Sequence, residues 1–142
     1  MEKTGKCLCG AVSITVKDFH EDVHACHCSM CTQWSAGPFL SVAGGTSKEV
    51  MVLPEDAVTC YQSSEWAERG FCKNCGTTLF YHVFYDDVYY LSASLFEETA
   101  EQKLTEEIFY DKKPAYYTFA NPTVKKTEAE IMAAVQAEFS EA

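Results

Sequence analysis

Arginine is almost absent from this sequence, and positive charge in general is scarce. The 142 residues include 11 lysines and arginines against 21 aspartates and glutamates, which gives a formal net charge of −10 at pH 7. Arg69 is the only arginine. Binding to nucleic acid requires clustered lysines and arginines that displace the counterions of the phosphates. The composition therefore argues against nucleic acid and against an anionic membrane surface as partners.

Long apolar runs are missing as well. No stretch approaches the roughly 18 apolar residues of a membrane-spanning helix, and the first six residues lack the apolar core of a secretory signal. We therefore expect a cytoplasmic protein. Repeats and linkers are also absent, so we expect a single zinc-binding domain over residues 1–142, with a core at about 5–120 and a carboxyl-terminal helix at about 127–140. The sequence does not indicate an oligomeric state.

Cysteine, in contrast, is abundant. Seven of the eight cysteines fall into three short motifs: Cys7-x-Cys9, Cys26-x-Cys28-x-x-Cys31 and Cys72-x-x-Cys75. A disulfide framework is one explanation, but cytoplasmic thiols stay reduced and these spacings are typical of metal-binding turns. We therefore favour zinc over disulfides.

The first and last motifs together supply four thiolates, the number that closes a tetrahedral structural zinc site. Cys7 and Cys9 lie two residues apart, so both sulfurs face one side of an extended chain. Gly10, which follows the first pair, permits a sharp backbone turn beside a metal, and Gly76 directly follows the second pair. Cys7, Cys9, Cys72 and Cys75 are the predicted ligands of a structural zinc ion.

The central motif supplies only three thiolates, from Cys26, Cys28 and Cys31. Three protein ligands leave a fourth position open to water or to a substrate atom, which a catalytic zinc needs. A substrate thiol that entered this position would lose its proton and become a nucleophile. The alternative is that His24, His27 or Cys60 closes the site, and the sequence leaves both possibilities open.

Period-two alternation and regularly spaced turns predict a mainly β fold. In residues 11–17, Val12, Ile14 and Val16 share one face of a strand. Residues 32–38 are rich in helix breakers and predict irregular structure. Thr127 and Glu130 form a capping box that predicts a helix, which we expect to pack on the β core rather than bind a partner. The other predicted strands cover residues 23–26, 39–42, 49–53, 57–61, 77–84, 88–93 and 106–110.

The motifs in this order resemble the glutathione-dependent formaldehyde-activating enzyme family, which also includes centromere protein V. The resemblance runs from Cys7 to about Tyr117 and comprises Cys7-x-Cys9-Gly10, Cys26-His27-Cys28-x-x-Cys31, Gly37-Pro38-Phe39 and Arg69-Gly70-Phe71-Cys72-x-x-Cys75-Gly76. It implies small antiparallel sheets in a tent-like arrangement around zinc. It also implies the same division of the cysteines into four and three, with the three-cysteine zinc as the active one.

The resemblance further implies the family's chemistry, the addition of glutathione to formaldehyde. The reverse reaction is cleavage of a carbon–sulfur bond in S-hydroxymethylglutathione. We therefore expect a zinc-dependent carbon–sulfur lyase or synthase that acts on a small thiol adduct, with Arg69 as a candidate anchor for a substrate carboxylate. Members often carry basic residues after the third central cysteine, where this chain has Thr32 and Gln33, so the thiol itself is left open. The alternative function is a non-catalytic zinc-binding module for protein interaction.

Overall fold

The computed structural model describes residues 1–141, and the side chains of residues 1–139. The chain divides into two compact units, each built from two separate segments. The first unit combines Met1–Asp22 with Ser41–Gln102, and the second combines Val23–Leu40 with the chain from Lys103 onward. The single domain expected from the sequence stays a prediction.

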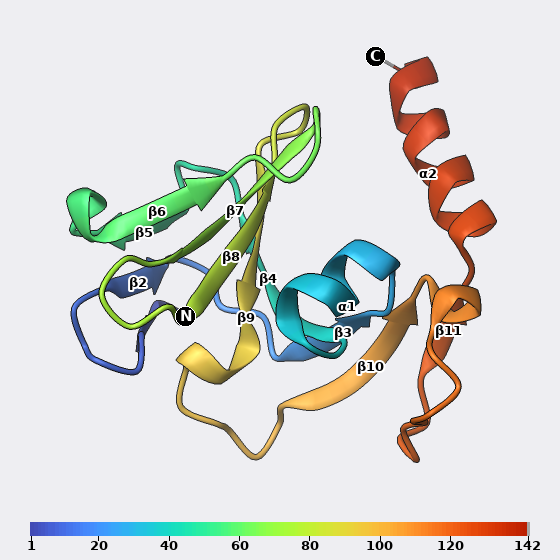
Figure 1. Cartoon of the computed structure of the whole chain (residues 1–142), viewed down its shortest axis with the longest axis horizontal. Helices are drawn as coiled ribbons and strands as arrows, with labels where there is room; N and C mark the ends of the chain where they lie inside the picture. Colours follow the sequence, from blue (N-terminus) through green and yellow to red (C-terminus); the bar gives the residue numbers. More distant parts are fainter. Residues whose placement is uncertain (142) are drawn as a thin grey trace. The chain divides into compact units, whose positions relative to one another are not determined.

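The first unit contains two antiparallel sheets. The smaller has the strand order β1-β2-β5, and the larger has the order β4-β9-β8-β7-β6, in which β6 to β9 run side by side (Figure 1). The strands of this unit are β1 (Lys3–Lys6), β2 (Ser13–Val16), β4 (Phe39–Gly45, which enters the unit at Ser41), β5 (Val50–Leu53), β6 (Val58–Tyr61), β7 (Ala67–Cys72), β8 (Thr78–Val83) and β9 (Val88–Ser92). Two short 3-10 helices, η1 (Glu55–Ala57) and η2 (Ala93–Leu95), complete it.

The core of this unit confirms the alternation read from residues 11–17. Val12, Ile14 and Val16 have no exposed surface, while Ser13 and Thr15 between them are half-buried. Apolar burial of this kind stabilises a fold by about 25 cal/mol per Å² of surface removed from water. The alternating pattern therefore identifies the buried face of β2 correctly.

Gly70 in β7 lies directly against the Phe80 ring of β8. It pairs with Phe80 in the sheet register, and a Cβ atom at Gly70 would lie 2.3 Å from the Phe80 ring. Phe80 is itself buried, so its ring has little room to move. Because β7 ends at Cys72, this contact also fixes the strand that presents the third metal-binding motif.

The second unit contains β3 (Asp22–Cys26), α1 (Ser29–Ser35), β10 (Lys103–Ile108), the 3-10 helix η3 (Tyr110–Lys112), β11 (Val124–Lys126) and α2 (Glu128–Glu141). Its strand order is β11-β10-β3. β10 and β11 pair in parallel, which departs from the antiparallel arrangement expected from the sequence. α2 follows directly on β11, as its red ribbon shows (Figure 1).

The prediction of irregular structure over residues 32–38 is wrong for its first half, because α1 continues to Ser35. The helix begins at Cys28, whose sulfur accepts a hydrogen bond from the backbone N–H of Cys31 at 3.3 Å. A cysteine sulfur here takes the place of the usual side-chain oxygen at a helix start. Residue propensities do not reveal this cap. The helix ends at Ala36, which has a left-handed backbone with φ of 58°.

The capping box at the start of α2 is confirmed. The N–H of Glu130 donates to the Thr127 hydroxyl at 3.2 Å, and the N–H of Thr127 donates to the Glu130 carboxylate at 3.4 Å. The expected packing is only partial, because Ile131 and Val135 are half-buried and Phe139 is 58% exposed.

We expect Gly70→Ala to destabilise the protein by about 1–3 kcal/mol, because the added methyl group overpacks a buried contact. Thermal or urea unfolding measures the change. Gly37→Ala is a matched control, since no atom lies within 4 Å of the added Cβ. Equal stability of the two variants would contradict this account of Gly70.

Candidate metal centres

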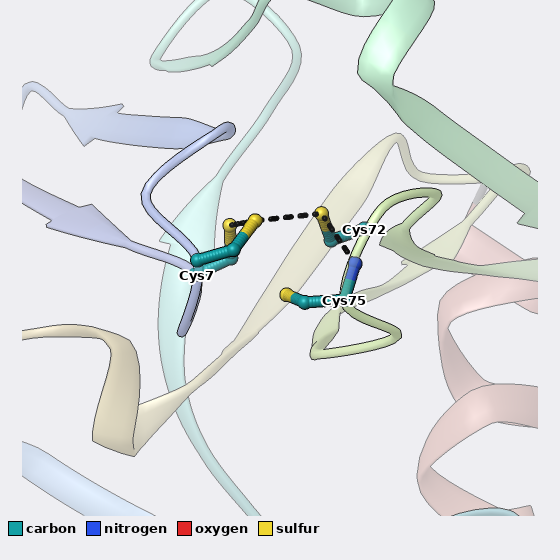
Figure 2. Close-up of side chains that lie close together, drawn as sticks. Cys7, Cys72 and Cys75 are labelled. Carbon is teal, nitrogen blue, oxygen red and sulfur yellow. Dashed lines mark hydrogen bonds between the residues drawn. The ribbon is translucent and has the colours of Figure 1, made fainter.

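Four cysteine sulfurs meet in the first unit. Those of Cys7, Cys9, Cys72 and Cys75 all lie within 4.8 Å of one another. The Cys7 and Cys9 sulfurs are 3.6 Å apart, and those of Cys9 and Cys72 are 3.8 Å apart. Zinc–sulfur bonds of about 2.3 Å in a tetrahedron place sulfurs about 3.8 Å apart. This group therefore has the donors and the spacing of a closed zinc site (Figure 2).

Two glycine turns direct these sulfurs to a common point. Gly10 and Gly76 both have left-handed backbones, with φ of 80° and 79°. The N–H of Gly10 donates to the Cys7 carbonyl at 3.0 Å, and the N–H of Gly76 donates to the Cys72 carbonyl at 2.8 Å. The sharp turn predicted at Gly10 is confirmed, and Gly76 forms a similar turn after its own cysteine pair.

Hydrogen bonds to sulfur favour the thiolate form that a metal requires. The N–H of Val12 donates to the Cys7 sulfur at 3.3 Å, and the side-chain amide of Asn74 donates to the Cys9 sulfur at 3.2 Å. Hydrogen bonds from Thr77, first from its hydroxyl and then from its backbone, lower the pKa of Cys75 to about 5. The pKa of Cys7 is also lowered, although burial alone would raise it. A backbone hydrogen bond from Cys75 acts to lower the pKa of Cys72, but burial and the side chains of Cys75 and Cys7 leave that pKa raised. The hydrogen bonds around Cys7 and Cys75 favour the thiolates that a cation would bind.

Three further sulfurs meet in the second unit, at the end of β3 and the start of α1. Those of Cys26, Cys28 and Cys31 lie within 4.8 Å of one another. The pKa of Cys26 is raised, first by its hydrogen bonds with Cys28 and Cys31 and then by burial. Three thiolates this close repel one another unless a cation neutralises them, and a divalent metal does so. The donor set therefore fits a metal ion.

None of the three candidates for a closing ligand joins this group within the described part of the chain. Both ring nitrogens of His27 form hydrogen bonds elsewhere, with Tyr117 and Glu107. His24 places Nδ1 3.5 Å from a carboxylate oxygen of Glu106. Cys60 is exposed on β6 in the first unit. The three-cysteine group is thus open in the part that the structure describes.

His27, which lies between two cysteines of the three-cysteine group in sequence, is part of a buried network of side-chain hydrogen bonds. The sequence alone does not predict this network. His27 Nε2 lies 2.8 Å from a Glu107 carboxylate oxygen, and His27 Nδ1 lies 2.6 Å from the Tyr117 hydroxyl. His27 is fully buried and Glu107 is 1% exposed. The second oxygen of Glu107 accepts from the Thr123 hydroxyl and lies 3.7 Å from the Lys125 ammonium. Burial acts against ionisation of Glu107, but these hydrogen bonds leave its pKa lowered.

Arg69 lies on β7 in the first unit and is 2% exposed. Its Nε donates to the Ser63 hydroxyl at 3.2 Å, and its guanidinium lies 4.7 Å from the centre of the Tyr81 ring. These contacts fix the side chain within its own unit. A role in substrate binding stays a prediction.

Comparison with known proteins identifies the family. The model of the glutathione-dependent formaldehyde-activating enzyme family matches residues 2–112. The chain belongs to this family. A Schizosaccharomyces pombe protein named as an uncharacterized lyase is 33% identical over 135 residues, which cover 94% of this chain and 97% of that protein. The resemblance seen in the cysteine motifs is thereby confirmed.

A crystal structure of a Rhodobacter sphaeroides protein has a similar fold, with a TM-score of 0.56. The match has 22% identity and covers 68% of this chain and 89% of the other. At this identity the similarity concerns the fold alone. No helix within residues 1–141 is long and apolar enough to cross a membrane.

Elemental analysis should find two zinc ions per chain. We expect Cys28→Ser to keep one ion and remain folded, because the three-cysteine group spans only six residues. We expect Cys9→Ser to lose the other ion and much of its stability, since a structural metal site contributes directly to folding.

Cys60→Ser is the control, because Cys60 belongs to neither group, and it should keep both ions. One ion per chain in both the wild type and Cys28→Ser would contradict a second metal site.

Proposed function

We propose that this protein is a zinc-dependent carbon–sulfur lyase, or synthase in the reverse direction, for a small thiol–aldehyde adduct similar to S-hydroxymethylglutathione. The observation that carries the proposal is the convergence of Cys26, Cys28 and Cys31, with no fourth protein ligand in the described residues. Membership of a family described as glutathione-dependent and formaldehyde-activating supports it, as does the lyase name of the yeast relative. We place the reaction in the cytoplasm, where the seven thiols stay reduced.

The reaction makes modest demands on the site. In the cleavage direction the carbon–sulfur bond breaks and its electron pair stays on sulfur. The hydroxyl oxygen of the adduct gives up its proton and forms the carbonyl of formaldehyde, and sulfur takes up a proton. Nothing is oxidised or reduced, so no second cofactor is needed. The site has to hold the sulfur, orient the hydroxyl and exchange one proton.

In this proposal the three cysteines provide the place where the sulfur of the adduct is held. A zinc ion held by these three cysteines would act as a Lewis acid and lower the pKa of a substrate thiol. The chain itself holds the cysteines in place. The Thr32 hydroxyl donates to the His27 carbonyl at 3.3 Å, and the His27 N–H donates to the Ile108 carbonyl at 3.1 Å. These bonds fix the backbone between Cys26 and Cys28.

The four-cysteine group has a different role in this proposal. All its ligand positions are filled by protein, so no position remains for a substrate. It joins the turn after β1 to the turn after β7, and we propose that its zinc stabilises the first unit. In this proposal the four-cysteine group stabilises the fold, and the three-cysteine group is the site of the reaction.

The second unit as a whole has five lysines and seven acidic residues, a net charge of −2, and only its lysine-rich segment before α2 supports an anionic thiol as substrate. Residues 103–126 include five lysines and three acidic residues, in a chain that is strongly acidic elsewhere. The Lys113 ammonium donates to the Pro114 and Tyr117 carbonyls rather than to a carboxylate. Its positive charge is therefore available to attract a carboxylate at longer range, and glutathione carries two.

The test is an assay of S-hydroxymethyl thiol cleavage, starting with S-hydroxymethylglutathione, on the metal-loaded protein. We expect wild type to accelerate formaldehyde release and Cys28→Ser to lose at least about 100-fold in kcat/KM, because the open position is lost. Cys60→Ser should retain full activity. A wild-type rate no higher than that of Cys28→Ser, for every thiol tested, would refute the proposal.

A further inference from the structure

We propose that Glu107 is a positioning residue for the three-cysteine group. Through His27 it holds the backbone between Cys26 and Cys28, and it thereby sets how tightly this group binds a metal ion. The inference rests on the proposed function, which needs a metal ion at these cysteines, and deepens it by naming a residue outside the ligands that controls the site. In this account Glu107 acts through His27 and touches neither the metal nor the substrate.

His27 is held at its backbone and at its ring. Its N–H donates to the Ile108 carbonyl at 3.1 Å, and its carbonyl accepts from the Thr32 hydroxyl at 3.3 Å. Its ring nitrogen Nε2 lies 2.8 Å from a carboxylate oxygen of Glu107. Glu107 and Ile108 are consecutive residues of β10, the strand next to β3 in the sheet. One short stretch of β10 therefore fixes both the backbone and the side chain of His27.

The covalent chain carries this restraint to the cysteines. Cys26 and Cys28 are the residues on either side of His27, and consecutive Cα atoms are about 3.8 Å apart. Each residue has only two soft backbone dihedrals, so the φ and ψ angles of His27 set the placement of Cys26 relative to Cys28. Their sulfurs and that of Cys31 lie within 4.8 Å of one another. A metal site tolerates deviations of only about 0.2 Å in its ligand distances, so a small rotation at His27 is enough to weaken it.

The other end of this link is also fixed. Glu107 is 1% exposed, and its second carboxylate oxygen accepts from the Thr123 hydroxyl and lies 3.7 Å from the Lys125 ammonium. Glu107 and Lys125 are also partners in the register of β10 and β11. A buried carboxylate with charged partners adds little net stability, and its best-attested effect is to select one geometry. Here it selects the orientation of the His27 ring, which is fully buried.

The three-cysteine group gains more from such a restraint than the four-cysteine group does. With one ligand fewer, it has fewer metal bonds to offset the entropy that is lost when its side chains are ordered. Ligands that are fixed before a metal ion arrives avoid much of that loss. The restraint from β10 therefore acts on metal affinity, and the proposed reaction depends on it only through the bound ion.

The experiment measures zinc affinity by competition with a chromophoric chelator, with no substrate present. Cys28→Ser shows which of the two ions belongs to the three-cysteine group. We expect Glu107→Met to bind that ion about 10- to 100-fold more weakly, the usual loss when a residue that orients a metal ligand is removed. It should bind the other ion as wild type does. Methionine has a similar length, but its sulfur is only a weak hydrogen-bond acceptor for His27.

Glu107→Gln is the conservative variant. Its side-chain oxygen still accepts from Nε2 of His27, so it should restore most of the affinity. Substitution with Co²⁺ gives a second readout, because the visible absorption of cobalt bound to thiolates depends on the ligand geometry. The part of the cobalt spectrum that Cys28→Ser lacks should change in Glu107→Met and return in Glu107→Gln. A general loss of structure would not produce this pattern.

Glu106→Met is the matched control on the same strand. Glu106 pairs with Lys126 and with His24 rather than with His27. The partly exposed ion pairs that this variant loses contribute little. Both zinc affinities should therefore stay at the wild-type value.

Tyr117→Phe tests the same restraint if Glu107→Met fails to fold. The Tyr117 hydroxyl lies 2.6 Å from Nδ1 of His27, so this variant removes the hydrogen bond at the other ring nitrogen. We expect the ion of the three-cysteine group to bind about 2- to 10-fold more weakly, the value of one hydrogen bond. Tyr116→Phe is the control, because Tyr116 is 80% exposed. Unchanged affinity in a folded Tyr117→Phe would then overturn the inference.

Unchanged affinity in a folded Glu107→Met, an equal loss at both ions, or a loss that Glu107→Gln does not restore would also overturn it. These outcomes are separate from those of the cleavage assay. If no S-hydroxymethyl thiol is cleaved, the proposed function fails, while a loss of zinc affinity confined to the three-cysteine group still supports the inference. If wild type cleaves the adduct and Glu107→Met binds both ions as wild type does, the inference alone fails.

Discussion

Repulsion between closely spaced thiolates is the constraint on which the structure depends. Seven cysteine sulfurs gather in two groups, and within each group they lie within 4.8 Å of one another. The pKa of Cys26 is raised first by its hydrogen bonds with Cys28 and Cys31, then by burial, and last by the negative charges of these two neighbours. The turns and N–H···S hydrogen bonds around them suit a bound cation. Metal binding at these groups would be linked to folding.

The sequence predicts those features that are determined locally. Cysteine spacing predicts both groups, because two thiolates separated by one or two residues converge whatever surrounds them. Alternation predicts the buried face that contains Val12 and Ile14, and the capping box predicts the start of α2. Each of these signals is contained in a few consecutive residues.

The features that the sequence does not predict are those that depend on distant partners or unusual caps. β1 and β7 were not expected as strands, and each contains a glycine that weakens the local signal: Gly5 in β1 and Gly70 in β7. α1 was not expected because a sulfur caps it. The contact between His27 and Glu107 joins residues 80 positions apart, and that between His27 and Tyr117 joins residues 90 positions apart. Without related sequences, no local pattern reveals such contacts.

The two cysteine groups also differ in the length of chain that they enclose. The four-cysteine group joins Cys9 to Cys72, which are 63 positions apart, so it closes a long loop and removes much entropy from the unfolded chain. The three-cysteine group lies within residues 26–31, so linking its cysteines constrains the unfolded chain very little. A metal ion held there would therefore be coupled only weakly to folding. Under the proposed function that ion could leave and return while the fold persists, so metal supply would set the active fraction of a constant pool of folded protein.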